Sequence, residues 1–247
     1  MKKFLALALV LCLAFSTVGC KEEEPEEKTV EELIDTSYYI LKSFENKGTP
    51  YQIKQSILMT SDDPVYNSSA STIFEIKGNC SRIAITVDNT ILKVTTIDDT
   101  HYLMLDNDGE VTKYKMQGAE QNGVYIAEAF KMVKAAKFSA GDFVDATASY
   151  ADGVWTVSAP SLSQSGIDVA KEYLSSITSN YIEITDGSAV YTFSKSKIAS
   201  MRLDINYYPS GSDSALSKIT IVTEYSYDDV SVPIPEDAHL YENLSAE

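Results

Sequence analysis

Side chains that could do acid-base or metal chemistry are few in this chain. Its 247 residues include only two histidines, His101 and His239, and neither stands in a context that marks a general base. The sequence has no Gly-x-Ser-x-Gly elbow and no glycine-rich phosphate loop. Asp106-Asn107-Asp108-Gly109 has the composition of part of a calcium loop, but Lys115 stands where an EF-hand needs a bidentate glutamate. We interpret that tetrapeptide as a turn between strands, and we expect no catalytic residue, no metal site, no cofactor and no enzymatic activity.

Cys20 is the residue with the clearest chemical context. It follows the small residues Val18 and Gly19, an apolar run over Phe4–Phe15 and a lysine pair near the start of the chain. This arrangement resembles the lipobox of bacterial lipoproteins, which implies a signal peptide over residues 1–19 and a lipid carrying palmitate-type chains on the Cys20 thiol. The apolar run is shorter than the roughly 20 residues of a membrane-spanning helix. We therefore expect a lipid-anchored protein on the extracytoplasmic side of a bacterial cell membrane, within the cell envelope.

Charge limits the partners of the chain. Residues 20–28 contain the cysteine and a run of lysine, glutamate and proline, which predicts a solvated acidic tether. The formal net charge of the whole chain is −16, and such a charge repels nucleic acid. We expect the membrane as a partner through the anchor, and a lipid or other apolar ligand, while the sequence identifies no protein partner. Cys80 lacks a second thiol in the mature chain, and we interpret it as a half-buried structural side chain.

Residues 29–247 are predicted to form a single domain. Thr29 and Glu32 form a capping-box pattern that predicts a helix ending before Gly48, and helical spacing returns over 124–137 and about 165–180. Period-two alternation predicts strands elsewhere. These strands are expected over 51–59, 72–77, 83–87, 91–97, 101–105, 111–116, 143–150, 154–159, 181–185, 189–194, 201–207 and 219–227. Short turns, including Asp152-Gly153 and Asp186-Gly187, make consecutive strands neighbours in the sheet.

The order of these elements resembles the LolA/LolB-like superfamily, which includes bacterial lipoprotein carriers and the mycobacterial glycolipid carriers of the LppX and LprG type. Phe74–Asn79, Ile83–Asp88 and Thr100–Leu105 are similar to the central hairpins of that superfamily, and Val232–Ala238 is similar to its closing segment. The resemblance implies an α+β fold. Its core is a curved antiparallel half-barrel of about eleven strands, with helices covering the concave face and an acyl-chain cavity between them.

The function that the resemblance implies is non-enzymatic binding of an apolar or lipid-like ligand in the half-barrel cavity. A sheet with one long apolar face must bury that face against something, and three modest helices leave room for a ligand. The residues expected to line the cavity are Met59, Phe74, Ile76, Ile85, Val87, Met104, Met201, Leu203, Ile205, Tyr207, Ile219 and Ile221. Two alternatives stay open: the same residues form an ordinary solid core, or the scaffold is an envelope protein-interaction or sensing module.

Overall fold

The computed structural model describes residues 27–43, 50–118, 136–177, 182–195, 197–209, 216–227 and 230–244. The predicted signal peptide, Cys20 and most of the predicted tether lie outside the described residues. The same holds for most of the helix predicted over 124–137 and for residues 44–49, where the first helix was predicted to end.

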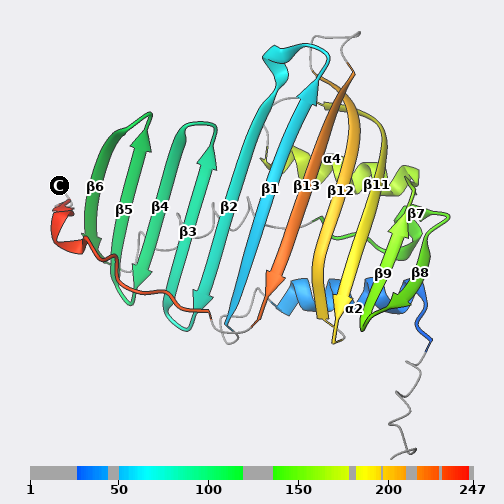
Figure 1. The fold of residues 1–247 in the computed structure, drawn as a ribbon, viewed down its shortest axis with the longest axis horizontal. Helices are drawn as coiled ribbons and strands as arrows, with labels where there is room; N and C mark the ends of the chain where they lie inside the picture. The colour runs from blue at the N-terminus through cyan, green and yellow to red at the C-terminus, as the bar shows by residue number, and fades with distance from the viewer. Residues whose placement is uncertain are drawn as a thin grey trace, which may run out of the picture.

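A single twelve-stranded sheet dominates the described part of the chain (Figure 1). Its strands, in spatial order, run β14-β6-β5-β4-β3-β2-β1-β13-β12-β11-β9-β8. The sheet is curved (Figure 1). It is also open, because its outermost strands β14 and β8 do not pair with each other. The bounds are β1 Tyr51–Ser61, β2 Ser68–Lys77, β3 Cys80–Val87, β4 Thr90–Ile97, β5 Thr100–Asn107, β6 Glu110–Gln117, β8 Thr147–Ala151, β9 Val154–Ala159, β11 Ile182–Ser194, β12 Lys197–Pro209, β13 Ser217–Ser226 and β14 Glu242–Asn243.

Strands β1 to β6 form the predicted meander of about six strands, and two-residue turns join neighbours from β2 to β6. Asp88, Asp98 and Asp108 have φ angles of 49°, 52° and 53° in these turns. Aspartate tolerates this left-handed region better than most residues, which explains why it recurs at the turns. The Asp106–Gly109 segment is confirmed as a turn, since the backbone N–H of Gly109 donates to Asp106 Oδ1 at 2.9 Å.

The predicted turn at Asp186-Gly187 is wrong. β11 runs through it as one strand, with a shift in its pairing to β12 between Ile184 and Asp186. A Cβ atom at Gly187 would lie 2.7 Å from Leu162 Cδ1 and 3.3 Å from the carbonyl oxygen of Asp204, so glycine here permits close packing and does not mark a reversal of the chain. The same dipeptide at Asp152-Gly153 is a true hairpin turn, with φ angles of 51° and 81°.

The predicted strand over 143–150 is also corrected. The predicted strand is interrupted at Asp145, where φ is 52°, and only the part after it, β8, joins the large sheet. The preceding residues form β7, Phe143–Val144, which pairs with β10, Ser161–Leu162, in a separate two-stranded sheet. Strands β10 and β14 are too short for an alternating pattern to reveal them.

Two helices, α2 over Val30–Ser43 and α4 over Gln164–Ile177, lie on the same side of β11, β12 and β13 (Figure 1). The predicted capping box of α2 is confirmed, because the Thr29 N–H donates to Glu32 Oε2 at 2.8 Å and the Glu32 N–H donates to Thr29 Oγ1 at 3.2 Å. The side of the sheet that these helices contact is called the helix face below.

The C-terminal segment crosses to the far edge of the sheet. It includes the 3₁₀ turn η3, Ala238–Leu240, and ends in β14, which pairs in parallel with β6 (Figure 1). The ring of Tyr241 packs edge-on against Tyr102 with centroids 5.4 Å apart, and Lys113 Nζ lies 2.6 Å from Asp237 Oδ2. Two further 3₁₀ turns are η1, Pro64–Tyr66, and η2, Ala140–Asp142.

Candidate functional site

The register of the strands builds one continuous apolar surface on the helix face. Ile53 on β1 pairs with Phe74 on β2, which pairs with Ile83 on β3, followed by Val94 on β4 and Leu103 on β5. From Ile57 on β1 the same face continues in the other direction, through Ile221 on β13 to Leu203 on β12. Because strand side chains alternate between faces, these directly opposed residues lie on one side of the sheet.

Cationic side chains avoid this face. In strands β1 to β6 and β13, and in β12 from Met201 onward, each lysine and arginine belongs to the register of the opposite face. They are Lys54, Lys77, Arg82, Lys93, Lys113, Lys115, Arg202 and Lys218. The helix face therefore offers no basic group at these positions to pair with a charged ligand.

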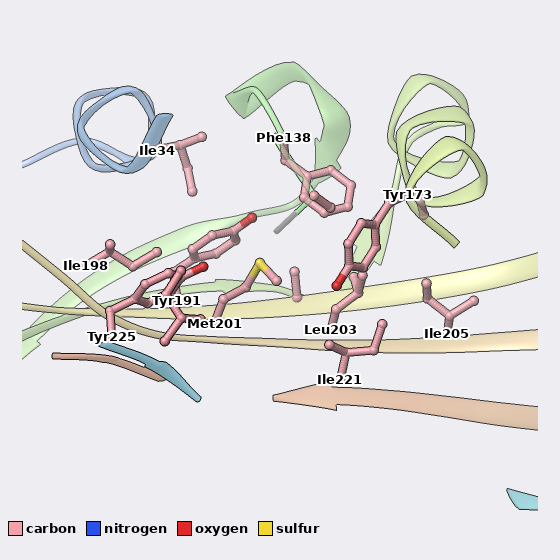
Figure 2. Packing of buried hydrophobic residues seen from close by; sticks show 14 of the residues in the cluster. Ile34, Phe138, Tyr173, Tyr191, Ile198, Met201, Leu203, Ile205, Ile221 and Tyr225 are labelled. Carbon is pink, nitrogen blue, oxygen red and sulfur yellow. The ribbon is translucent and has the colours of Figure 1, made fainter. Parts of the chain in front are cut away.

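The part of the helix face on β11, β12 and β13 is a solid core. Met201, Leu203, Ile205, Ile219 and Ile221 are each 0% exposed. Figure 2 shows side chains from both helices and from the segment before η2 packed against this part of the sheet; those labelled are Ile34, Tyr173 and Phe138. We call this region, β13 to β8 with α2 and α4, the helix-packed half.

Strands β2 to β6, on the other side of β1, are called the meander half, and the helix face of this half opens toward one end of the strands. Along β3 the exposed fraction rises from 1% at Ile83 to 9% at Ile85 and 41% at Val87. On the neighbouring strands Leu92 is half-buried and Leu105 is 39% exposed. The described helices make their main contacts elsewhere, α2 with β12 and η2, and α4 with β11, β10 and η2. Apolar side chains are thus accessible at this end of the face.

The residues predicted to line a cavity share the helix face with a single exception. Met104 pairs with Lys93 and Lys113 and so belongs to the opposite face. Met59 is half-buried and Val87 exposed. The other predicted residues are buried: Phe74, Ile76, Ile85, Met201, Leu203, Ile205, Tyr207, Ile219 and Ile221.

One residue of interest escaped the sequence analysis. Gln55 occupies the helix-face register of β1, between Ile53 and Ile57, and is 2% exposed. Its Nε2 donates to the Tyr173 hydroxyl at 2.9 Å and to Thr223 Oγ1 at 3.2 Å. Its Oε1 has no hydrogen-bond partner among the residues that the structure describes. A polar side chain in an apolar register position was the signal that the sequence carried.

The buried tyrosines of the core stay protonated at neutral pH. Burial raises the pKa of Tyr173, and the hydrogen bond from Gln55 offsets this only in part. Burial also raises the pKa of Tyr191 and Tyr225 well above the ordinary tyrosine value. Their hydroxyls therefore act as neutral hydrogen-bonding groups and not as charges.

Groups that could do chemistry are not assembled in the described residues. His101 is buried, with Nδ1 3.0 Å from Thr96 Oγ1 and Nε2 3.2 Å from the carbonyl oxygen of Gly118, while His239 lies in the exposed turn η3. Within the described ranges no group of three or more His, Cys, Asp or Glu residues could hold a metal ion. None of the described helices is long and apolar enough to cross a membrane.

Comparison with protein-family models and with curated proteins found no match. Among solved structures, the chain is similar to a DUF1329 family protein from Desulfovibrio piger ATCC 29098, with 10% identity and a TM-score of 0.27 over 82% of this chain and 95% of that chain. It is also similar to an N-terminal dehydratase from the difficidin assembly line, with 11% identity and a TM-score of 0.13 over 78% and 83% of the two chains. TM-scores this low do not establish a common fold, so the function rests on the geometry of this chain.

Proposed function

We propose that this protein is a membrane-anchored lipoprotein that binds an apolar or lipid-like ligand, without chemistry, against the helix face of its meander half. In this proposal the fold is a LolA-type half-barrel whose helices lie over the concave face. The observation that carries the proposal is the gradient of exposure along one apolar face, from Ile83 to Val87 and across to Leu105.

The contrast between the two faces of the meander half supports this function. Lys93 on β4 and Lys115 on β6 stand on the opposite face, whereas Leu92 on β4 and Leu105 on β5 stand on the helix face. Fully burying an exposed valine or leucine side chain contributes about 1.5–3 kcal/mol. Val87 is 41% and Leu105 39% exposed, so covering either one with a ligand contributes only part of that, about 1 kcal/mol each. The lysines and the arginine of these strands thus lie on the face opposite the one where we place the ligand.

The anchor rests on the sequence pattern around Cys20. Two acyl chains give stable attachment where one does not, and the acidic stretch after the cysteine keeps the folded part away from the lipid surface. Replacing Cys20 with serine should move the protein from the membrane fraction into the soluble fraction. Retention of the Cys20→Ser variant in the membrane would contradict a lipid anchor on this thiol.

Binding is tested by extracting the purified full-length protein with chloroform and methanol and analysing the extract by mass spectrometry. The expected result is a non-covalent lipid present at near one molecule per chain, because a thioether-linked anchor is not extracted. The second readout is fluorescence of the neutral dye N-phenyl-1-naphthylamine, which should rise on binding. An empty extract together with no dye binding would overturn the proposal.

A further inference from the structure

A row of three polar side chains, on three neighbouring strands, interrupts the apolar helix face between the helix-packed half and the meander half. Gln55 on β1 pairs with Thr72 on β2 and with Thr223 on β13, so the three side chains lie side by side on one face. All three are buried. We call them the polar seam.

The polar seam contains an unsatisfied amide. Gln55 Nε2 has two hydroxyl partners, and Oε1 has no partner among the described residues. If the amide is turned by 180°, the two hydroxyls donate to Oε1 and Nε2 becomes the atom without a partner. A buried polar atom without a hydrogen bond costs about 1–3 kcal/mol, so an apolar residue would serve the core better at this position.

We infer that Gln55 hydrogen-bonds a hydroxyl group of the bound ligand, which makes the ligand an uncharged amphipathic molecule such as a long-chain alcohol or an acylglycerol. The inference rests on the proposed function. A hydroxyl suits the site because it donates to an amide oxygen and accepts from an amide N–H, so it satisfies Gln55 in either orientation.

Charge argues against an ionised head group at the seam. The lysines of the three strands that carry the seam, Lys54, Lys77 and Lys218, belong to the opposite face, and the hydroxyls of Tyr173 and Thr223 are neutral. A carboxylate or phosphate placed here would be a buried charge with no described cation beside it, which is strongly unfavourable.

The path for the apolar part of the ligand follows one cross-strand row. From Gln55 the row passes through Thr72 and Ile85 to Leu92 and ends at the exposed Leu105. Neighbouring strands are about 4.8 Å apart, so these four steps cover roughly 19 Å, a distance that a long alkyl chain spans. The hydroxyl would lie at the buried end of the row and the alkyl chain would point toward its exposed end.

The test compares an alcohol with the matching alkane. Full-length protein is held in an amphipathic polymer, so that free detergent does not compete, and 1-dodecanol or dodecane displaces bound N-phenyl-1-naphthylamine. Gln55→Met removes the amide at nearly constant volume, and Gln117→Met makes the same change at an exposed position of β6. We expect Gln55→Met to weaken 1-dodecanol binding about tenfold and to leave dodecane binding unchanged, because one hydrogen bond is lost. Gln117→Met should change neither.

The remaining outcomes separate the inference from the function on which it rests. Equal effects of Gln55→Met on alcohol and alkane, or no effect on either, would overturn the hydroxyl contact while ligand binding stands. Failure of the wild-type protein to bind the dye, together with an empty lipid extract, would overturn both. If Gln55→Met does not fold, Thr223→Val tests the same point, because it removes a hydroxyl that holds the amide and should weaken 1-dodecanol binding selectively. A crystal structure with a lone water at Gln55 and 1-dodecanol bound elsewhere would also contradict the inference.

Discussion

The helix-packed half and the meander half belong to one sheet, and apolar and polar side chains alternate along the strands of both. The two halves differ in how far the apolar side chains of the helix face are buried. In the helix-packed half, Leu203 and Ile221 are 0% exposed beneath α2 and α4. In the meander half, Val87 and Leu105 lie on the same face of the sheet and remain exposed. Alternation therefore specifies which face of a strand is apolar, and the packing of helices decides whether that face becomes a core or a surface available to a ligand.

The largest expected effect concerns the solid core. Leu203→Ala should lower the free energy of unfolding by about 2–5 kcal/mol, because it leaves a cavity in a region that the helices hold in place. Urea unfolding monitored by circular dichroism measures this change. A loss below about 1 kcal/mol would mean that this half is loosely packed and that the contrast between the halves is wrong.

The bulge in β11 gives a second test of close packing in the helix-packed half. Gly187→Ala should cost about 1–3 kcal/mol, because the new methyl group would meet Leu162 Cδ1 at 2.7 Å and the carbonyl oxygen of Asp204 at 3.3 Å. Gly141→Ala is the matched control, since its Cβ would come no closer than 4.0 Å to Ser139 Oγ. Equal melting temperatures for the two variants would show that Leu162 does not fill this space.

The opposite face of the helix-packed half has a charge network that should respond to pH. Asp204 accepts hydrogen bonds from Arg202 Nε at 2.7 Å and Thr220 Oγ1 at 2.6 Å, and Lys218 Nζ lies 3.0 Å away. Burial alone would raise the pKa of Asp204, but these three partners outweigh it and hold the pKa below its usual range.

Asp204→Asn should therefore cost about 1–2 kcal/mol at pH 7. The lowered pKa of Asp204 contributes stability above the pKa of the unfolded chain, near 4, and this contribution is lost as the pH falls further. The difference between the wild type and Asp204→Asn should accordingly shrink below about pH 4 in urea titrations. A difference that grows on acidification would contradict the network.

The smallest expected effect lies at the exposed end of the meander half. Val87→Ala should change the free energy of unfolding by less than about 0.5 kcal/mol, whereas Ile83→Ala on the same strand should cost about 2–5 kcal/mol. The pair shows whether the burial gradient along β3 exists in solution. Similar losses for both variants would mean that the end of the strand is covered.

Much of the sheet could be predicted because alternation is a local property. The turns of the meander are marked by aspartate, asparagine and glycine at each reversal, and short turns leave neighbouring strands no other partner. The Asp-Gly pair at 186–187 misled the prediction because it lies inside a long strand, and its glycine packs close to Leu162, a contact that only the folded chain reveals.

The candidate site was harder to predict for a related reason. In the strand over Thr100–Asn107, apolar residues occupy both registers, so the sequence did not say whether Met104 or its neighbours Leu103 and Leu105 belong to the helix face. Gln55 was overlooked because its importance depends on Tyr173, which lies more than a hundred positions away in the chain.

The most direct test of the ligand-binding face compares two valines of similar exposure on opposite faces of the meander half. Val87 is 41% exposed on the helix face, and Val111 is 49% exposed on the other face. The measurement is the affinity of the full-length protein for N-phenyl-1-naphthylamine in the wild type, Val87→Ser and Val111→Ser. We predict binding by the wild type, a loss of severalfold in Val87→Ser and no change in Val111→Ser. Equal affinities in all three proteins, or a loss only in Val111→Ser, would contradict a ligand site on the helix face.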